Sequence, residues 1–423
     1  MHMNGYRCIA CAEAQATNFA GFVCPCCGGN LEITYDYAAI AKDVAGGFGD
    51  GRTDLFRYAP LLPVKAIDAP FPLLVGGTPM YAAPRLGESL GLRNLYLKDD
   101  TVNPSASTKD RAGAVALRRA MEIGAKVVSV ASTGNAGSSL ACLAAALGLR
   151  AVVFVPENAP AAKLTQALSF GATVLAVRGN YDDAFDLCLA ASKEFGWFNR
   201  STGYNPFTRE GKKTCAYEIW ESLGERVPDR IVVPAGDGNI LSGIWKGWCD
   251  LRAVGLVDRV PKIDCAQSDA SAAICLAVRR IRDMGESNPD WSTVVIDEVK
   301  ASTAADSISV DRPRDGLAAV KSIFQSGGET VTVPDEEIFA AVSEMARTTG
   351  IFAEPAAAAP WAAVKQMVRD DKIEADELVV CIVSGSGLKD IANIRKTVGK
   401  PVIIDPSIDA IKNAGSFPLS GSG

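Results

Sequence analysis

Short apolar runs rich in β-branched residues alternate along this chain with longer stretches of alanine, leucine and charged residues. The short runs predict strands and the longer stretches predict helices. The predicted strands are residues 126–131, 150–155, 173–177, 230–234, 262–266 and 378–383. The predicted helices include 138–147, 182–195, 241–253 and 270–284. Strands separated by helix-length segments are typical of parallel sheets buried on both faces, so the pattern predicts an α/β fold.

The 423-residue chain carries 43 basic and 49 acidic residues, a formal charge of −6, and is 48% hydrophobic. At about 100–200 residues per domain, this length predicts two or three domains with ample core and excludes a disordered chain. The mild acidic excess argues against a nucleic-acid partner. The chain has no apolar run of about 18 residues and no apolar leader after Met1. We therefore expect a cytosolic protein that binds no membrane.

His2, close to the N-terminus, is the only histidine in the sequence. Within one chain this excludes the mechanisms that need an imidazole. They include the Ser-His-Asp and Cys-His nucleophilic arrangements, HExxH zinc hydrolysis and the iron site built from two histidines and a carboxylate. Proton transfer must therefore depend on lysine, aspartate, glutamate, tyrosine or cysteine.

Cysteines are concentrated at the N-terminus, where two CxxC pairs follow each other with twelve residues between them. The pairs are Cys8 with Cys11 and Cys24 with Cys27, and Cys26 is a spare thiol. In a cytosolic chain this spacing predicts a tetrahedral four-cysteine zinc site in a ribbon-like knuckle over residues 1–37. Such a site is closed, which favours a structural role over a catalytic one. The alternative is a knuckle that has lost its metal.

Polar and flexible residues gather in three loops that follow predicted strands, where α/β proteins bind ligands. The loops span residues 130–137, 234–239 and 384–387. The first carries hydroxyls, an amide and two glycines, although a helix cap alone would need only one such residue. The glycines of the second can form an anion-binding nest at a helix N-terminus, but alone they are a weak signal. The third begins with a serine.

Lys109 lies in a segment, residues 103–111, that opens a helix. Ser107 and Asp110 have the spacing of a capping box. Apolar residues then mark a buried stripe that ends before Gly124: Ala112, Val115, Ala116, Ala120 and Ile123. A cation in the first helical turn is disfavoured by the helix dipole. A lysine held as a neutral imine, or one whose pKa is lowered, has a reason to lie there, whereas a plain surface lysine would be mildly destabilising.

Together these residues form a set suited to pyridoxal phosphate. The lysine would form the Schiff base, the glycine nest would hold the 5′-phosphate, and a serine hydroxyl would face the pyridine nitrogen. A hydroxyl stabilises a full pyridinium less than a carboxylate does. This favours replacement or elimination at the β or γ carbon over transamination.

The motifs around these residues resemble those of the fold-type II pyridoxal phosphate enzymes, and most closely those of the threonine synthases. The resemblance runs from the cysteine pairs to about residue 400. Its motifs, in chain order, are Phe56-Arg57-Tyr58, Leu61-Leu62-Pro63, Gly76-Gly77-Thr78-Pro79, Leu95-Tyr96-Leu97-Lys98-Asp99-Asp100, the Lys109 segment, Ser132-Thr133-Gly134-Asn135, Gly211-x-Lys213-Thr214, Phe352-x-Glu354-Pro355 and Gly387-Leu388-Lys389-Asp390.

The resemblance implies two doubly wound parallel-sheet domains of the tryptophan synthase β-like kind behind the knuckle. The large cofactor-binding domain would comprise residues 38–100 and 215–405. The smaller, mobile domain would comprise 101–214 and carry the Schiff-base lysine segment and a substrate-binding loop. Residues 406–423 would form a tail. A homodimer is also expected.

The resemblance further implies roles for individual residues. Lys109 would hold the cofactor and move protons. The other cofactor contacts would come from Asn135 at the ring hydroxyl, from Gly236, Asp237, Gly238, Asn239 and Ile240 at the phosphate, and from Ser384 at the pyridine nitrogen. Ser132 and Thr133 would bind the substrate carboxylate. Lys213, with Lys98 and Arg209 as further candidates, would neutralise a phosphorylated leaving group.

The reaction implied is the conversion of O-phospho-L-homoserine and water to L-threonine and phosphate. Some site residues depart from the family pattern. Asn-Pro-x-Arg becomes Asn205-Pro206-Phe207-Thr208, with arginine displaced to Arg209, and Asp237 places a negative charge in a shortened phosphate loop. These changes keep open a β-replacement or β-elimination enzyme, such as a cysteate synthase or a serine, threonine or diaminopropionate ammonia-lyase. A zinc-ribbon binding module or a scaffold without cofactor is the alternative outside enzymes.

Overall fold

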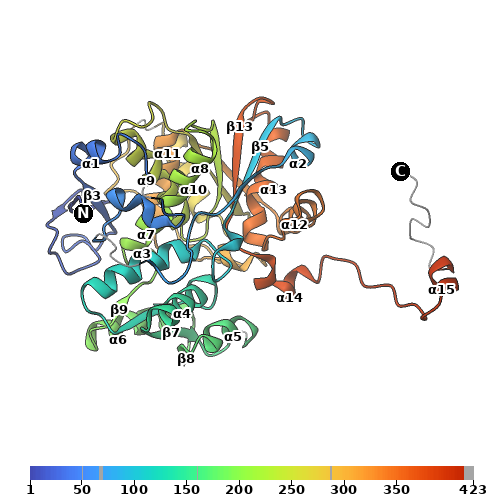
Figure 1. The fold of residues 1–423 in the computed structure, drawn as a ribbon, viewed down its shortest axis with the longest axis horizontal. Coiled ribbons are helices and arrows are strands. Elements are labelled where there is room, and N and C mark those ends of the chain that lie inside the picture. The colour runs from blue at the N-terminus through green and yellow to red at the C-terminus, as the bar shows by residue number, and fades with distance from the viewer. Residues whose placement is uncertain (50, 66–69, 160, 286–287, 414–423) are drawn as a thin grey trace.

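A computed structural model describes residues 1–49, 51–65, 70–159, 161–285 and 288–413. The described residues form three sheets (Figure 1). The N-terminal sheet is antiparallel, with strand order β2-β1-β3, and consists of β1 (Met3–Cys8), β2 (Ala14–Gln15) and β3 (Leu31–Tyr35). It carries the cysteine pairs in its connections.

The largest sheet has six strands in the order β12-β11-β10-β13-β5-β4, and β4 alone runs antiparallel to its neighbour. Neighbouring residues of β13 pack on opposite faces: Val379 and Cys381 contact one core cluster, whereas Val380 and Ile382 contact another. Both faces of the sheet are therefore covered, as the apolar run predicted. The strands are β4 (Met80–Ala82), β5 (Asn94–Asp99), β10 (Arg230–Pro234), β11 (Lys262–Ser268), β12 (Thr330–Val333) and β13 (Leu378–Val383).

The smaller parallel sheet has the order β8-β7-β6-β9 and lies beside the large one (Figure 1). Its strands are β6 (Val127–Ala131), β7 (Arg150–Pro156), β8 (Thr173–Val177) and β9 (Phe198–Asn199). Helices α4 (Asn135–Leu147) and α6 (Tyr181–Glu194) cover its faces: Val153 packs in one apolar cluster with Leu140 of α4, and Phe154 in another with Phe185 of α6. All four strands fall within residues 101–214. The expected domain boundaries, and the mobility of the smaller domain, stay predictions.

Helices connect and cover these strands. The α-helices are α1 (Tyr37–Asp43), α2 (Pro84–Glu88), α3 (Lys109–Glu122), α4 (Asn135–Leu147), α5 (Ala161–Ser169), α6 (Tyr181–Glu194), α7 (Phe207–Lys212), α8 (Thr214–Ser222), α9 (Asn239–Ala253), α10 (Ala273–Asp283), α11 (Gly316–Ser326), α12 (Asp335–Thr349), α13 (Pro355–Arg369), α14 (Ile391–Ile394) and α15 (Ile408–Asn413). Short 3-10 turns are η1 (Leu55–Leu61), η2 (Asp100–Val102), η3 (Asp306–Ile308) and η4 (Gly387–Lys389).

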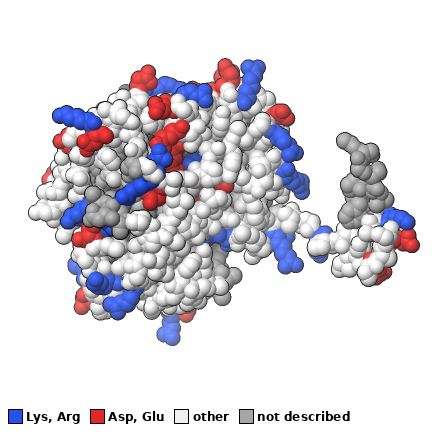
Figure 2. Space-filling view, viewed as in Figure 1, with Lys and Arg blue, Asp and Glu red and all other residues white. Residues whose placement is uncertain are grey.

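The C-terminal part of the chain leaves the body after α14, and α15 lies apart from it (Figure 1). The last ten residues of the expected tail, 414–423, lie outside the described residues. Every helix among the residues that the structure describes is too short or too polar to serve as a membrane span. On the face drawn in Figure 2, basic and acidic side chains are interspersed rather than gathered into one patch.

The sequence pattern located all six predicted strands to within two residues at either end, but it missed others. The missed strands are β1, β2, β3, β4, β5, β9 and β12. Three of them, β2, β4 and β9, have only two or three residues, and β1, β2 and β3 belong to the knuckle. Two expectations for α3 are wrong. Asp110 forms no capping box with Ser107, because its carboxylate accepts hydrogen bonds from the backbone N–H and the hydroxyl of Ser105, both at 2.6 Å. Ile123 is 57% exposed rather than buried.

A buried ion network fixes α3 to the large sheet. Arg111 Nη2 lies 2.8 Å from Asp100 at the end of β5 and 2.6 Å from Glu218 on α8. Lys98 on β5 also donates to Glu218, at 2.7 Å. Burial opposes ionisation of Glu218, but Arg111 and Lys98 hold its pKa well below the ordinary value. The start of α3, where Lys109 lies, is thereby held in one place.

We expect Glu218→Gln to lower the free energy of unfolding by about 3–5 kcal/mol, because it leaves Arg111 and Lys98 buried with too little compensating charge. Denaturant unfolding measures this loss. Asp409→Asn is the control: it removes one partner of an exposed pair with Lys412, on α15, and should cost less than about 1 kcal/mol. Equal losses in the two variants would contradict a stabilising role for the buried network.

Candidate active site

The first residue of α3, Lys109, is held against the loop that follows β13. The backbone N–H of Thr108 donates to the carbonyl of Ser384 at 2.8 Å, and the N–H of Ser386 donates to the carbonyl of Ala106 at 3.0 Å. Ala106 takes a positive φ of 63°, which a non-glycine residue rarely adopts. The tight turn it makes brings the lysine segment and the loop after β13 together.

The amine of Lys109 lies in an environment where its neutral form is easier to reach than in water. Burial lowers the pKa of Lys109 below its ordinary value of 10.5, and the cations Arg200 and Lys389 lower it further. The carboxylates of Glu354 and Asp237 act in the opposite direction. A neutral amine can attack a carbonyl carbon or accept a proton, so this environment suits a nucleophile or base.

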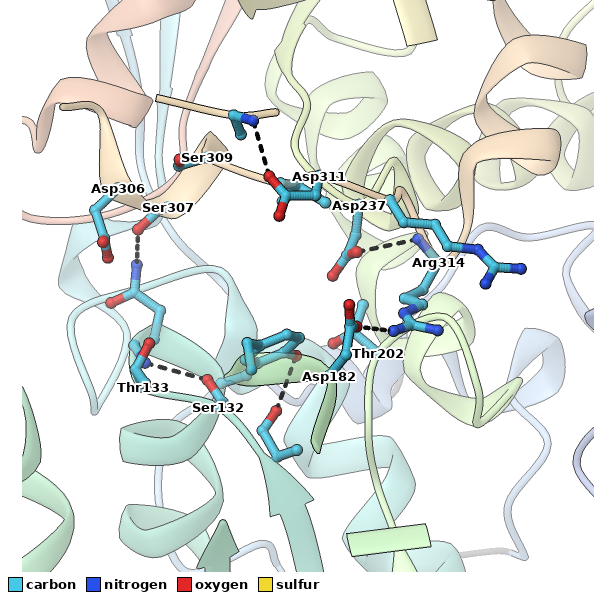
Figure 3. Close-up of a pocket in the computed structure, with 18 of the residues that line it drawn as sticks. Ser132, Thr133, Asp182, Thr202, Asp237, Asp306, Ser307, Ser309, Asp311 and Arg314 are labelled. Carbon is cyan, nitrogen blue, oxygen red and sulfur yellow. Dashed lines mark hydrogen bonds and ion pairs between the residues drawn. The ribbon is translucent and has the colours of Figure 1, made fainter. Parts of the chain in front are cut away.

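Two cavities meet at Lys109. The larger, of about 460 Å³, is lined by Ser132, Thr133 and Asn135 from the loop after β6, and by residues of the segment before α11. Figure 3 shows Ser132, Thr133 and Ser307 on one side of it and Asp182, Asp237 and Arg314 on another. The smaller cavity, of about 50 Å³, is lined by all five residues of the glycine loop, Gly236, Asp237, Gly238, Asn239 and Ile240, and by Ser384. The structure therefore brings together Lys109 and every residue expected to contact the cofactor, with Ser132 and Thr133.

Asn135 is oriented by a buried glutamate. Its Nδ2 donates to the carboxylate of Glu354 at 2.9 and 3.1 Å, and to the hydroxyl of Ser307 at 3.2 Å. Burial raises the pKa of Glu354, although the Asn135 amide and Lys109 oppose that shift. Because these contacts occupy the amide nitrogen, its Oδ1 is the atom available to a ligand.

The glycine loop turns directly into α9, and its shape depends on two glycines. Gly238 is the N-cap and has a φ of 87°, in the left-handed region where side chains are strained. At Gly236 a Cβ would lie 3.0 Å from Val310 and 3.1 Å from Ile308. The first turn of a helix leaves backbone N–H groups without partners in the helix, and these can bind a phosphate.

These residues fit pyridoxal phosphate. A partly buried amine, an oriented amide, a glycine cradle at a helix N-terminus and a hydroxyl line adjoining cavities.

The structure does not bring Lys98, Arg209 or Lys213 to these cavities. Lys98 pairs with Glu218, and Arg209 forms an ion pair with Asp315 on α11. Lys213 lies 2.5 Å from Glu210 and 2.7 Å from Asp250. Each of the three cations is buried and already neutralised by a carboxylate. The phosphate contact expected of them therefore stays a prediction that their positions do not support.

Sequence reasoning missed three residues that line or orient the site. Glu354 was part of a motif, but nothing in the sequence paired it with Asn135. Lys212 is the unassigned position between Gly211 and Lys213, and it lines the smaller cavity. Thr202 lines both cavities. The one available signal in the sequence was the pair of adjacent lysines, Lys212 and Lys213. Adjacent residues of a helix point in different directions, so these two side chains have different surroundings.

The four cysteines of the two CxxC pairs converge in the knuckle. The sulfurs of Cys8, Cys11, Cys24 and Cys27 all lie within 4.8 Å of one another. Cys8 and Cys27 are 3.5 Å apart, and Cys11 and Cys24 are 3.7 Å apart. Zn–S bonds of about 2.3 Å in a tetrahedron place sulfurs about 3.8 Å apart, so the cluster fits a closed zinc site.

The knuckle touches the elements that carry the site. Asn30, three residues after Cys27, donates from Nδ2 to the Asp315 carboxylate at 3.0 Å and to the Arg314 carbonyl at 2.7 Å. Asp315 in turn accepts from Asn239 in the glycine loop at 2.8 Å. The fold of the knuckle is thereby connected to the N-terminus of α9.

Comparison with known proteins agrees with this geometry. The sequence profile of the family described as "Pyridoxal-phosphate dependent enzyme" matches residues 72–385. The threonine synthase of Methanocaldococcus jannaschii is 37% identical over 409 residues, which cover 96% of this chain and 98% of the relative. The chain belongs to the threonine synthase family of pyridoxal-phosphate dependent enzymes. Members of this family are carbon–oxygen lyases.

Other threonine synthases are similar over much of their length. That of Methanosarcina acetivorans is 36% identical, with 96% of this chain and 98% of the relative covered. That of Mycobacterium tuberculosis is 34% identical, with 82% and 92% covered. Among solved structures, threonine deaminase isoform 2 of Solanum lycopersicum matches with a TM-score of 0.62 at 20% identity, over 76% of this chain and 88% of that chain. The structural match confirms the fold-type II architecture with its two parallel sheets.

The lowered pKa of Lys109 predicts that the apoprotein reacts with pyridoxal phosphate with a midpoint below pH 10.5, because the neutral amine is the reacting form. Glu354→Gln removes a negative charge that favours the ammonium, so it should move the midpoint to a still lower pH. The initial rate of chromophore formation, followed against pH, measures both midpoints. Glu374→Gln, a change on the exposed surface, is the control. An unchanged midpoint in Glu354→Gln would argue against the proposed electrostatic coupling.

Removing zinc should weaken cofactor retention as well as the fold, because Asn30 would lose its fixed position against Asp315. We expect Cys24→Ser to bind less zinc, to unfold at a lower temperature and to release pyridoxal phosphate faster. Elemental analysis, thermal unfolding and the chromophore measure the three effects. Cys26→Ser is the matched control, since Cys26 is exposed and lies outside the cluster. Zinc-free wild-type protein with full stability and full cofactor content would refute a metal role.

Proposed function

We propose that this protein converts O-phospho-L-homoserine and water to L-threonine and phosphate. The observation that carries the proposal is the meeting of Lys109, Asn135, Ser384 and the glycine loop at adjoining cavities, in a chain similar along its length to threonine synthases. A cytosolic location and a homodimer belong to the same proposal, as the sequence suggests them.

When bound, pyridoxal phosphate would supply an electron sink for negative charge that develops on the carbons of the amino acid. Lys109 Nζ would bind the aldehyde carbon of the cofactor, and the same amine would move protons at the α and β carbons of the substrate. Phosphate would leave from the γ carbon, and water would add at the β carbon. The low pKa of Lys109 supports both roles of its amine.

The other residues would bind and orient. Asn135 would present Oδ1 to the cofactor's ring hydroxyl, because Glu354 holds its amide nitrogen. Ser132 and Thr133, at the start of the loop after β6, would receive the substrate carboxylate in the larger cavity. Ser384 would face the pyridine nitrogen. Its position beside Lys109 follows from the backbone hydrogen bond to Thr108.

Two observations favour a second candidate, β-replacement or β-elimination on another amino acid. Thr208 occupies the place of the family's arginine, and its buried hydroxyl donates to the Asn205 carbonyl at 2.7 Å instead of extending towards a ligand. Asp237 adds a carboxylate to both cavities. Cations in a site stabilise a bound phosphorylated substrate, whereas the negative charge of Asp237 repels it.

Phosphate release separates these candidates. Wild-type protein should release phosphate faster, relative to enzyme, from O-phosphohomoserine than from O-phosphoserine, with threonine formed in equal amount. Release of ammonia from serine, threonine or diaminopropionate, without turnover of O-phosphohomoserine, would instead favour the second candidate.

Lys109→Ala should remove both the yellow chromophore and all turnover while the chain stays folded, because the amine is the covalent and proton-transferring group. Absorbance, phosphate release and circular dichroism measure the three properties. Lys126→Ala, at an exposed lysine just before β6, is the control and should keep all of them. Full activity in Lys109→Ala would exclude the proposed role.

A further inference from the structure

Lys212, the last residue of α7, is a buried cation that faces the glycine loop without a carboxylate partner. Its Nζ lies 2.7 Å from Asn239 Oδ1, a neutral amide oxygen, and its side chain is among the largest fully buried ones. Among the residues that the structure describes, it makes no ion pair. A buried ammonium with only a neutral acceptor is costly, so a ligand of opposite charge would stabilise it.

The neighbouring residue, Lys213, is a buried cation whose charge is balanced by carboxylates. Lys213 points the other way and lies between Glu210 and Asp250, 4.2 Å from the centre of the Tyr35 ring. Lys212 lines the smaller cavity, together with the glycine loop, Lys109 and Ser384. One lysine of the pair therefore serves the fold, whereas the other is directed at the ligand cavity.

A second polar group near the cavity also lacks a partner. The hydroxyl of Thr202 is shielded from solvent and makes no hydrogen bond, although Thr202 lines both cavities. Buried polar groups in folded proteins normally have a partner, so this hydroxyl, which lines the cavities, is free to bind a ligand there. Lys212 and Thr202 thus offer an ammonium and a hydroxyl beside the N-terminus of α9.

The contact between Lys212 and Asn239 lies next to residue 208, where the family pattern has an arginine. Thr208 Oγ1 lies 3.5 Å from Asn239 Oδ1, the atom that Lys212 also contacts. The positive charge lost at residue 208 is therefore present again in this chain, four residues later, beside the same amide. Asn239 keeps its orientation because its Nδ2 donates to Asp315.

We propose that Lys212 and Thr202 bind a phosphate monoester at the loop formed by Gly236–Ile240. The ammonium neutralises the phosphate, the hydroxyl donates to it, and the backbone of the loop surrounds it. Both the cofactor and the proposed substrate carry a phosphate monoester. Binding of the cofactor's phosphate is independent of the function proposed above, whereas binding of the substrate's phosphate rests on it. Burial lowers the pKa of Lys212, as do Lys109 and Arg200. The carboxylates of Asp237 and Asp315 act on this pKa in the opposite direction, and a bound dianion would raise it.

The first arm of the test uses the cofactor alone. Apoprotein is titrated with pyridoxal 5′-phosphate and with pyridoxal, which lacks the phosphate, and chromophore formation gives both affinities. If the cofactor phosphate is the ligand, Lys212→Met should weaken pyridoxal 5′-phosphate by about tenfold to a hundredfold and leave pyridoxal unchanged. Lys212→Arg should restore most of the loss. Thr202→Val, which keeps the shape, should cost about twofold to tenfold with the same selectivity.

The control is Lys389→Met. Lys389 is a partly buried lysine near the site, but the cavity it lines contains no residue of the glycine loop, and its amine donates to Ser138 and Gln166. Its loss should not discriminate between the phosphorylated and unphosphorylated cofactor. Thermal unfolding of each variant checks the fold. If Lys212→Met does not fold, the affinities of Thr202→Val for pyridoxal 5′-phosphate and for pyridoxal test the proposal instead.

The second arm measures turnover of O-phosphohomoserine by the holoenzyme. If the substrate phosphate is the ligand, Lys212→Met should raise KM by about tenfold to a hundredfold while the affinity for pyridoxal 5′-phosphate stays unchanged. Equal losses for pyridoxal and its phosphate, or no change in either arm, would overturn the proposal. If the wild type does not turn over O-phosphohomoserine, the proposed function fails, but the first arm still tests Lys212.

Discussion

The carboxylate of Asp315 is the interaction on which the site depends. It lies fully buried at the start of α11 and accepts hydrogen bonds from Asn30 of the knuckle, Arg209 of α7, and Asn239 and Ser242 of α9. Its backbone N–H also donates to the carbonyl of Asp237 in the glycine loop, at 3.0 Å. A buried charge is tolerated only when its hydrogen bonds are satisfied, so these partners fix one another. The knuckle, α7 and the glycine loop therefore cannot shift independently, and the distant four-cysteine cluster is linked physically to the loop that lines the smaller cavity.

The buried cations of this protein differ in function according to their partners. Lys98, Arg209 and Lys213 each lie against a carboxylate, and each ties two elements together. Lys109 and Lys212 form no such pair with any residue that the structure describes, and both line the smaller cavity. A buried cation paired with a carboxylate ties elements together, whereas a buried cation that lines a cavity without such a pair is a candidate for binding an anion. This distinction assigns ligand binding to the lysine that the family motif leaves undefined.

Much of the site could be predicted from the sequence, because strand-to-helix loops concentrate polar residues at one edge of a parallel sheet. The loop after β6, the glycine loop and the loop after β13 were identified for that reason, whereas the lysine segment was identified by a cation in the first turn of a predicted helix. The choice among the cations could not be predicted. Residues 212 and 213 differ by one position, and only the packing of α7 against α9 decides which one faces the loop. The contacts of Asp110 and Glu354 could not be predicted either. Asp110 accepts hydrogen bonds from Ser105 instead of forming the predicted capping box, and Asn135, the partner of Glu354, is far away in sequence.

The protonation of Lys212 on α7 and of Asp237 in the glycine loop depends on burial and on the neighbouring charges. Burial lowers the pKa of Lys212 and raises that of Asp237, so both groups are driven towards their neutral forms. A phosphate monoester brings about two negative charges near neutral pH and favours the ammonium of Lys212. The same ligand disfavours the carboxylate of Asp237. Anion binding is therefore linked to proton uptake at both residues, and lower pH strengthens it. Selectivity of the proposed site for a phosphorylated ligand would then depend on proton uptake at Lys212 of α7 and Asp237 of the glycine loop, since Thr208 stands where the family pattern has an arginine.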